Sequence, residues 1–227
     1  MRKSLISKTN KAHTRSRYRS KSLQRKLPLQ LVWRRDIGGE YVSDVILADL
    51  DRDTHPEILT LGVSFGGGGQ VHLTLLNPDG TLKWTVDRPR PTGDYPLSFA
   101  VGDVNGDTIP DIVFALEDNL LVFSGDDGHL LLTIPLSSTG SGQGTTTLVV
   151  LDVDGDGVNE IAGAVRGIAF VASHTGQLLW TYASGGSFGS MSTFGVVDLD
   201  LDGYPELVFP TFRGPLVALG GRTGQAR

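Results

Sequence analysis

The stretch "DVDGDGVNEI" (152–161) places aspartates at 152, 154 and 156 and a glutamate at 160. It follows an apolar run, "TLVVL" (147–151), which has the length and the β-branched character of a strand. Alternating carboxylates beside a strand occur in calcium loops, but an acidic turn between two strands has a similar composition. The choice between these alternatives depends on whether the rest of the chain repeats the pattern.

The pattern occurs four times. Each copy lies between two short apolar runs, and a strand-like run, a glycine-containing turn and another strand-like run follow it. Each period therefore predicts four short strands and no helix, which is typical of a β-propeller blade. The copies are "DLDRDTHPEIL" from Asp49, "DVNGDTIPDIV" from Asp103, "DVDGDGVNEIA" from Asp152 and "DLDLDGYPELV" from Asp198, at intervals of 54, 49 and 46 residues.

We therefore expect an all-β fold, a β-propeller of about four four-stranded antiparallel blades. The segment "LQLVWRRDIG" (29–38) resembles the outer strands of two blades, with Trp33 at the position of Trp84 and Trp180. Since the last blade stops where its own fourth strand should begin, we expect the strand 29–38 to complete that blade and close the ring, which would remove an exposed strand edge. The expected blades are 43–87, 97–136, 146–183 and 193–224, and a basic disordered tail, 1–28, precedes them.

Charge separates the tail from the rest of the chain. Residues 1–35 hold 12 Lys or Arg and no acid, whereas the remaining residues have a net charge of −17. The acidic part is not expected to bind nucleic acid, and the tail lacks the apolar core of a secretory signal peptide. The absence of cysteine excludes disulfides and thiolate zinc sites, and no apolar stretch is long enough for a transmembrane helix.

Oxygen ligands recur at the same positions of each copy. Positions 1, 3, 5 and 9 carry carboxylates or, once, an amide, and position 7 offers its backbone carbonyl. Calcium takes about six to eight oxygens, so this set suits it, while magnesium keeps more waters and is the weaker candidate. Up to four calcium ions are expected, and because the 15 ligand carboxylates nearly account for the charge of −17, calcium should stabilise the fold. The predicted ligands are Asp49, Asp51, Asp53, His55, Glu57, Asp103, Asn105, Asp107, Ile109, Asp111, Asp152, Asp154, Asp156, Val158, Glu160, Asp198, Asp200, Asp202, Tyr204 and Glu206.

These copies are similar to the FG-GAP/VCBS repeat family, the calcium-loop blades of integrin α-subunit propellers and of many bacterial surface proteins. The resemblance covers residues 43–227 and rests on "DVNGDTIPDIV", "DVDGDGVNEIA" and "DLDLDGYPELV". It implies a calcium-binding propeller scaffold that serves binding or cell adhesion. The chain departs from the family at Thr54 and Thr108, where the family usually has glycine, so both threonines are expected to be strained if their φ is positive.

The expected function is a non-catalytic, calcium-binding module without catalytic residues. It would bind a protein or carbohydrate through the face loops "SFGGGG" (64–69), "STGSGQG" (138–144) and "ASGGSFGSMS" (183–192), as a monomer or a ring-completing dimer. Calcium modules of millimolar affinity usually work outside the cell, so an extracellular or cell-surface location is expected.

Two alternatives stay open. The first is an enzyme on the same scaffold, such as a polysaccharide lyase or a quinoprotein-like dehydrogenase. A lyase needs a basic residue near the centre of the ring, and the only lysine of the acidic part, Lys83, is predicted on an outer strand. The second alternative is a fragment of a larger FG-GAP/VCBS protein.

Overall fold

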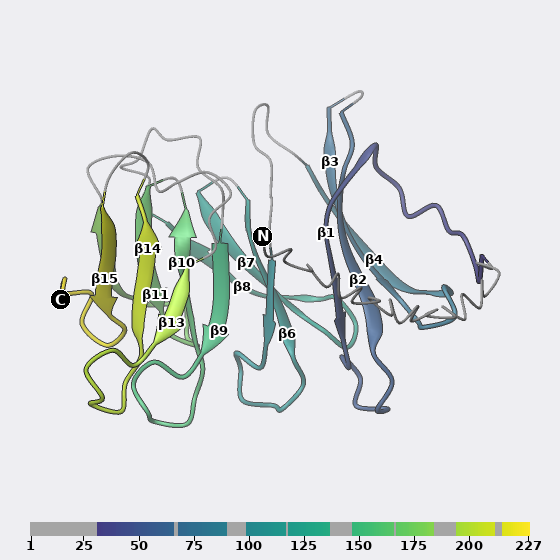
Figure 1. Ribbon diagram of the computed structural model, residues 1–227. Helices are drawn as coiled ribbons and strands as arrows, with labels where there is room; N and C mark the ends of the chain where they lie inside the picture. Colours follow the sequence, from purple (N-terminus) through teal and green to yellow (C-terminus); the bar gives the residue numbers. More distant parts are fainter. Residues whose placement is uncertain are drawn as a thin grey trace, which may run out of the picture. The chain divides into compact units, whose positions relative to one another are not determined.

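The computed structural model describes residues 31–65, 68–89, 99–116, 118–136, 147–165, 167–183, 194–211 and 215–227. The basic tail, the predicted contact loop 138–144 and nearly all of the loop 183–192 lie outside these residues, as do Gly66 and Gly67. Within the described part of the chain every regular element is a strand, and no helix is long and apolar enough to cross a membrane (Figure 1). The strands are β1 (Tyr41–Ala48), β2 (Glu57–Val63), β3 (Gln70–Leu76), β4 (Leu82–Pro89), β5 (Phe99–Gly102), β6 (Asp111–Leu116), β7 (Asn119–Ser124), β8 (Leu130–Pro135), β9 (Thr147–Leu151), β10 (Glu160–Val165), β11 (Ile168–Ala172), β12 (Leu178–Ala183), β13 (Gly195–Val197), β14 (Glu206–Pro210) and β15 (Leu216–Gly220).

The strands form four antiparallel sheets, one for each repeat of the sequence. Sheet 1 has the order β1-β2-β3-β4, sheet 2 β5-β6-β7-β8, sheet 3 β9-β10-β11-β12 and sheet 4 β13-β14-β15. Every strand pairs with the next one along the chain, so each sheet is a meander (Figure 1). The predicted all-β class and the repeated antiparallel sheet are confirmed.

Burial differs between the strands of a sheet in the way their sequences predict. The second strands β6 ("DIVFAL") and β10 ("EIAGAV") are buried at every residue, because their apolar runs are covered on both faces. The outer strand β12 ("LLWTYA") alternates between half-buried and exposed residues, which is the period of two expected when one face meets solvent. The inner part of each sheet is therefore its best-buried part.

The hydrophobic core lies between consecutive sheets. Three clusters of buried side chains join sheet 1 to sheet 2, sheet 2 to sheet 3, and sheet 3 to sheet 4. Because a small isolated sheet is marginal in water, each sheet depends on its neighbours for stability. In the first cluster Phe114 and Phe123 stack with their ring centroids 5.5 Å apart, and the fully buried side chains of the three clusters include Leu61, Phe123, Val122, Phe170, Val171 and Leu207.

Tryptophans tie the outer strand of a sheet to the hairpin of the next sheet. Trp84 of β4 donates its indole N–H to a backbone carbonyl of the sheet 2 hairpin at 3.2 Å, and Trp180 of β12 does the same to sheet 4 at 2.7 Å. Their rings cover Gly128 and Gly224, where a Cβ atom would lie 2.9 and 2.5 Å from the nearest ring atom. These two tryptophans therefore pack between sheets.

Trp33 makes the same contact to sheet 1, and this corrects the prediction of ring closure. Its ring covers Gly80, and its indole N–H donates to the Pro78 carbonyl at 3.2 Å. Residues 31–37 form no strand, and Ala226 forms a β-bridge with Leu219 of β15. The predicted pairing of 29–38 with the last repeat is therefore wrong for the residues that the structure describes, because Trp33 packs on the sheet that follows it in sequence.

The hairpin glycines allow a direct test of the tryptophan contacts. Gly128 and Gly176 hold the same repeat position with φ of +74° and +86°, but the nearest atom to a new Cβ is Trp84 at 2.9 Å in one case and Ile134 at 3.4 Å in the other. Both alanine substitutions should cost about 1–2 kcal/mol for the left-handed backbone. Gly128→Ala should cost roughly 1–3 kcal/mol more, because the indole must move. Urea unfolding in one buffer measures the difference, and equal losses would show that the indole does not constrain the hairpin.

Candidate metal centre

Each acidic stretch connects the first and second strands of its sheet. We name these connections loop 1 (49–57), loop 2 (103–111), loop 3 (152–160) and loop 4 (198–206), and number the residues of each from 1 to 9. The ninth residue is in every loop the first residue of the second strand. All the ligands predicted from the sequence therefore lie in four equivalent connections.

The carboxylates hold the backbone of the loops in one common conformation. The first aspartate accepts the amide of the sixth residue through Oδ2, at 3.0, 2.7, 2.9 and 3.0 Å in loops 1 to 4. The fifth accepts the amide of the seventh at 2.7, 2.7, 2.8 and 2.9 Å. In loops 1 to 3 the third also accepts the amide of the fifth, at 3.0, 2.9 and 3.2 Å. In loops 2 to 4 the other oxygen of the first aspartate also accepts a backbone amide, so the chain winds tightly around the acids.

The ninth residue is an acid that the fold buries. Glu57, Asp111, Glu160 and Glu206 are 1%, 0%, 3% and 1% exposed. One oxygen of each accepts the amide of the second residue of its loop, at 2.8, 2.9, 3.0 and 2.8 Å. An ionised carboxylate without a further partner is costly at such a position. In loop 2 the remaining oxygen, Oδ1 of Asp111, is buried and has no hydrogen-bond partner among the described residues.

The fourth and sixth residues of every loop have positive φ, between 62° and 92°. Both Thr54 and Thr108 have φ of 71°, so the strain predicted for them is present. A non-glycine residue in this region costs about 1–2 kcal/mol. Loop 3 avoids that cost because it has Gly155 and Gly157 at these positions. Within the described residues, the non-glycine residues with positive φ are Arg52, Thr54, Thr108 and Leu201, all in these loops.

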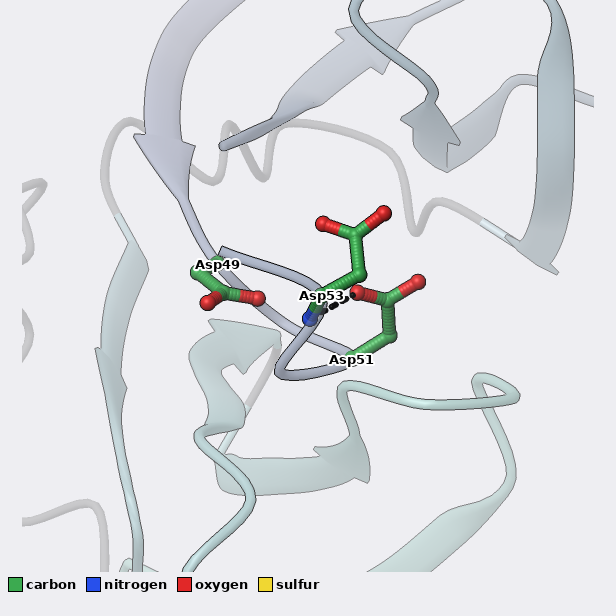
Figure 2. Close-up of side chains that lie close together, drawn as sticks. All are labelled: Asp49, Asp51 and Asp53. Atoms are coloured by element: carbon green, nitrogen blue, oxygen red, sulfur yellow. Dashed lines mark hydrogen bonds between the residues drawn. The ribbon is translucent and has the colours of Figure 1, made fainter. Parts of the chain in front are cut away.

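Three of the loops bring three carboxylates together closely enough to share one cation. Within the described residues the groups have one oxygen from each member, all within 4.8 Å of one another. Figure 2 shows the group of loop 1 around a single turn, with the Asp53 amide bonded to Asp51. Loop 2 forms no such group, because Asn105 replaces the third acid and its amide donates to Asp107 at 2.9 Å. The three groups are Asp49, Asp51 and Asp53; Asp152, Asp154 and Glu160; and Asp198, Asp200 and Glu206.

The seventh residues are placed beside the acids by their amides. Each donates its N–H to the fifth side chain, as described above, and the imidazole of His55 also lies 3.3 Å from Asp53. Ligation by the carbonyls of these residues stays a prediction. The seventh residues are His55, Ile109, Val158 and Tyr204.

Burial governs the ionisation of the acids in loops 2 and 3. It raises the pKa of Asp111 to about 6, against the amides of Val104 and Asn105, which act to lower that pKa. Burial also raises the pKa of Glu160, and the other carboxylates of loop 3 add to the shift. Burial acts on Asp152 in the same sense, but backbone amides of its loop outweigh it and hold the pKa of Asp152 below its ordinary value. Within the described residues, no basic side chain forms an ion pair with these acids.

Two basic side chains that the sequence did not assign to the site enter loops 1 and 4. Lys83 forms ion pairs with Asp51 and with Glu57, the latter at 3.6 Å from Nζ to Oε1. Arg227 contacts the third, fifth and ninth residues of loop 4 at 2.8, 3.3 and 3.6 Å. The hydrogen bond from Lys83 lowers the pKa of Asp51, and the loop carboxylates raise the pKa of Lys83 although burial opposes them. The sequence could have indicated Lys83 and Arg227 by their position, because each stands three residues after a hairpin glycine.

Neighbouring loops contact one another. Arg52 of loop 1 donates to the carbonyls of Asp107 and Thr108 in loop 2, at 2.7 and 3.2 Å. Asn159 of loop 3 donates to the Asp103 carbonyl of loop 2 at 2.8 Å. Loops 1, 2 and 3 therefore form a continuous row along one end of consecutive sheets.

The donor set fits calcium and fits few other metals. It consists of carboxylate and amide oxygens, without cysteine or a histidine ring among the converging atoms of the described residues. Hard cations prefer such oxygen donors, and the buried, unpartnered Asp111 Oδ1 marks a place where a cation would satisfy an oxygen.

Comparisons with known proteins agree with the repeat and the fold. The chain is similar in structure to the V. cholerae biofilm matrix protein Bap1, with 23% sequence identity, a TM-score of 0.54, and coverage of 80% of this chain and 27% of Bap1. It is also similar to BBS1N in its complex with ARL6DN, with 14% identity, a TM-score of 0.56, and coverage of 82% of this chain and 55% of that one. The chain thus spans less than two thirds of either protein, and at these identities the likeness shows the fold alone.

At the level of sequence, no curated protein matches the chain. The model of the FG-GAP-like repeat matches residues 49–114, which run from the start of loop 1 into β6. Residues 49–114, with loops 1 and 2, therefore belong to the FG-GAP-like repeat family, as the sequence predicts.

Proposed function

We propose that the protein is a non-catalytic binding or adhesion module whose propeller-type scaffold is stabilised by calcium at its acidic loops, up to four ions in all. The observation that carries the proposal is the common conformation of the loops, each with a buried acid at the ninth position. In loops 3 and 4 that acid groups with the first and third side chains, and in loop 1 the first, third and fifth side chains group together. This arrangement concentrates negative charge around a few oxygens, of which Oδ1 of Asp49 and Oδ1 of Asp111 are buried without a hydrogen-bond partner in the described chain. A hard divalent cation neutralises that charge and supplies the missing partner.

Calcium is favoured over magnesium by the number of carboxylates. Loops 3 and 4 each offer four acids, whereas magnesium keeps several waters and takes one or two carboxylates. Loop 3 is the best candidate, because glycine at its fourth and sixth positions leaves it without backbone strain.

The binding role rests on the division between a rigid scaffold and its loops. A biofilm matrix protein has a similar fold, which supports a role in binding outside the cell or at its surface. The partner would be a protein or a carbohydrate that the loops between strands contact. A lyase-type enzyme is less favoured, because Lys83, the only lysine after residue 35, is held by Asp51 and Glu57.

Calcium should stabilise the chain through the loops. At a hundredfold excess over the dissociation constant, one site adds about 2.7 kcal/mol, which is roughly 5–10 °C for a chain of this size. Asp156→Asn should reduce the calcium-induced rise in melting temperature by that amount and change the melting temperature little in chelator. Asp126→Asn is the matched control, because it removes the same charge from an exposed hairpin position outside the loops. Thermal unfolding and isothermal titration on the full chain measure both effects, and a wild-type chain that gives no calcium heat, or responds equally to magnesium, would contradict the proposal.

The pH dependence in chelator should expose Asp111. Because its pKa is raised from 3.8 to about 6 in the folded chain, the protonated acid stabilises the fold. That contribution is complete below about pH 4 and is lost as the pH rises through about 6. The unfolding free energy should therefore fall over this window by roughly 1–3 kcal/mol more in the wild type than in Asp111→Asn. Urea unfolding at several pH values measures the difference, and parallel profiles would rule out Asp111 as the titrating group.

Ligand binding should depend on calcium. A glycan array, probed with the full chain in calcium and again in chelator, is expected to give signals that chelator abolishes, because the acidic loops lie on the scaffold that holds the contact loops. Signals of equal strength in calcium and in chelator would show that ligand binding does not depend on the acidic loops. If no glycan binds in calcium, the proposed ligand is a protein, and a panel of matrix proteins is probed in the same way. No binding to either panel would overturn the binding role.

A further inference from the structure

One repeat position separates the four repeats into two pairs. It lies three residues after the hairpin glycine, and in sheets 1 to 3 it is the extra residue of a β-bulge in the outer strand, where the register shifts. In repeat 4 the same offset from Gly224 falls on the residue after the bridge of Ala226. The four occupants are Lys83, Leu131, Leu179 and Arg227. We call this the bulge position, and its residue is basic in repeats 1 and 4 and apolar in repeats 2 and 3.

Both basic side chains reach the same part of the loop in their own repeat. Lys83 contacts the third and ninth acids of loop 1, and Arg227 contacts the third and ninth acids of loop 4, with the fifth in addition. Within the described residues, the third and ninth acids of loop 4 belong to a group of oxygens close enough to share one cation. The ammonium and the guanidinium therefore lie among the oxygens that a metal ion would use, and their charge opposes a second cation there.

Loops 2 and 3 have no such side chain. Leu131 and Leu179 carry no charge, and in the described chain no basic group forms an ion pair with an acid of either loop. Arg52 reaches loop 2, but it donates to backbone carbonyls. Among the ninth acids, Oδ1 of Asp111 in loop 2 is buried without a hydrogen-bond partner in the described chain, whereas Oε1 of Glu57 and of Glu206 lies 3.6 Å from Lys83 and from Arg227. Oδ1 of the first aspartate of loop 1, Asp49, is also buried without such a partner.

We propose that Lys83 and Arg227 are built-in cations that replace a metal ion in loops 1 and 4, so that only loops 2 and 3 take calcium. The inference rests on the proposed calcium binding and narrows it from four potential sites to two. The residue at the bulge then determines the class of each loop: a basic residue makes the loop independent of metal, and leucine leaves it dependent on metal.

Exchange of the bulge residues tests this directly. Lys83→Leu gives repeat 1 the residue of repeats 2 and 3, and Leu179→Lys gives repeat 3 the residue of repeat 1. Isothermal titration with calcium chloride on the full chain should give two sites in the wild type, three in Lys83→Leu and one in Leu179→Lys. In chelator, Lys83→Leu should also melt several degrees below the wild type, because Glu57 loses its cation while buried, and calcium should restore the loss.

Arg88→Leu is the control, since Arg88 lies on the same strand as Lys83 and instead stacks over Phe123 at 5.1 Å. It should leave the stoichiometry at two. Four sites in the wild type and in Lys83→Leu would overturn the built-in cations while calcium binding stands, whereas no calcium heat in any variant would overturn both. If Lys83→Leu does not fold, the loss of one site in Leu179→Lys decides the question, and an unchanged stoichiometry there refutes the proposal.

Discussion

A buried acid that uses one oxygen on the backbone and needs a cation for the other is the constraint on which each repeat depends. Glu57, Asp111, Glu160 and Glu206 all begin the second strand of a sheet and are at most 3% exposed. Burying a carboxylate is unfavourable unless hydrogen bonds and an opposite charge compensate. The amide of the second loop residue supplies the hydrogen bond, and the remaining acids of the loop gather at the place where the opposite charge must lie. The acidic loop thus forms the cation-binding environment that the buried acid requires.

The same constraint links the loops to the hydrophobic core. The second loop residue donates its amide to the buried acid, and in loops 1 to 3 its side chain, Leu50, Val104 or Val153, is fully buried. Each of these side chains belongs to the cluster that joins its own sheet to the next. Neutralising the acid therefore fixes a residue that holds two sheets together, which gives a physical reason for cation binding to affect the stability of the scaffold as well as the loop. In loop 4 the equivalent residue, Leu199, is 55% exposed, so this link is absent there.

The sequence predicts features that depend on local pattern and misses those that depend on the path of the chain between repeats. The strands and the loop positions follow from periodicity, and the strain at Thr54 and Thr108 follows from the glycine that the similar family usually has there. The partner of Trp33 was predicted wrongly because likeness to an outer strand does not tell which neighbouring sheet receives the indole, and the repeated contact is with the hairpin of the next sheet. The contact between Lys83 and Asp51 was missed because it joins residues 32 positions apart through a bulge that strand alternation does not reveal.

The residue at the fourth loop position divides the loops in the same way as the bulge residue. At the fourth loop position, loops 2 and 3 have glycine, whereas loops 1 and 4 have Arg52 and Leu201 at φ of 64° and 62°. A free ion must be taken from solution, so the part of its binding energy that goes into forcing a strained backbone weakens its affinity. A cation attached to the same chain loses less entropy on entering the loop and is present at every ion concentration, so it can hold a strained loop closed. At the fourth position the two features are consistent with one explanation, in which glycine serves a loop that closes around an exchangeable ion and strain is tolerated where the chain supplies the charge itself. The sixth position does not follow this division, because loop 2 has Thr108 and loop 4 has Gly203 there.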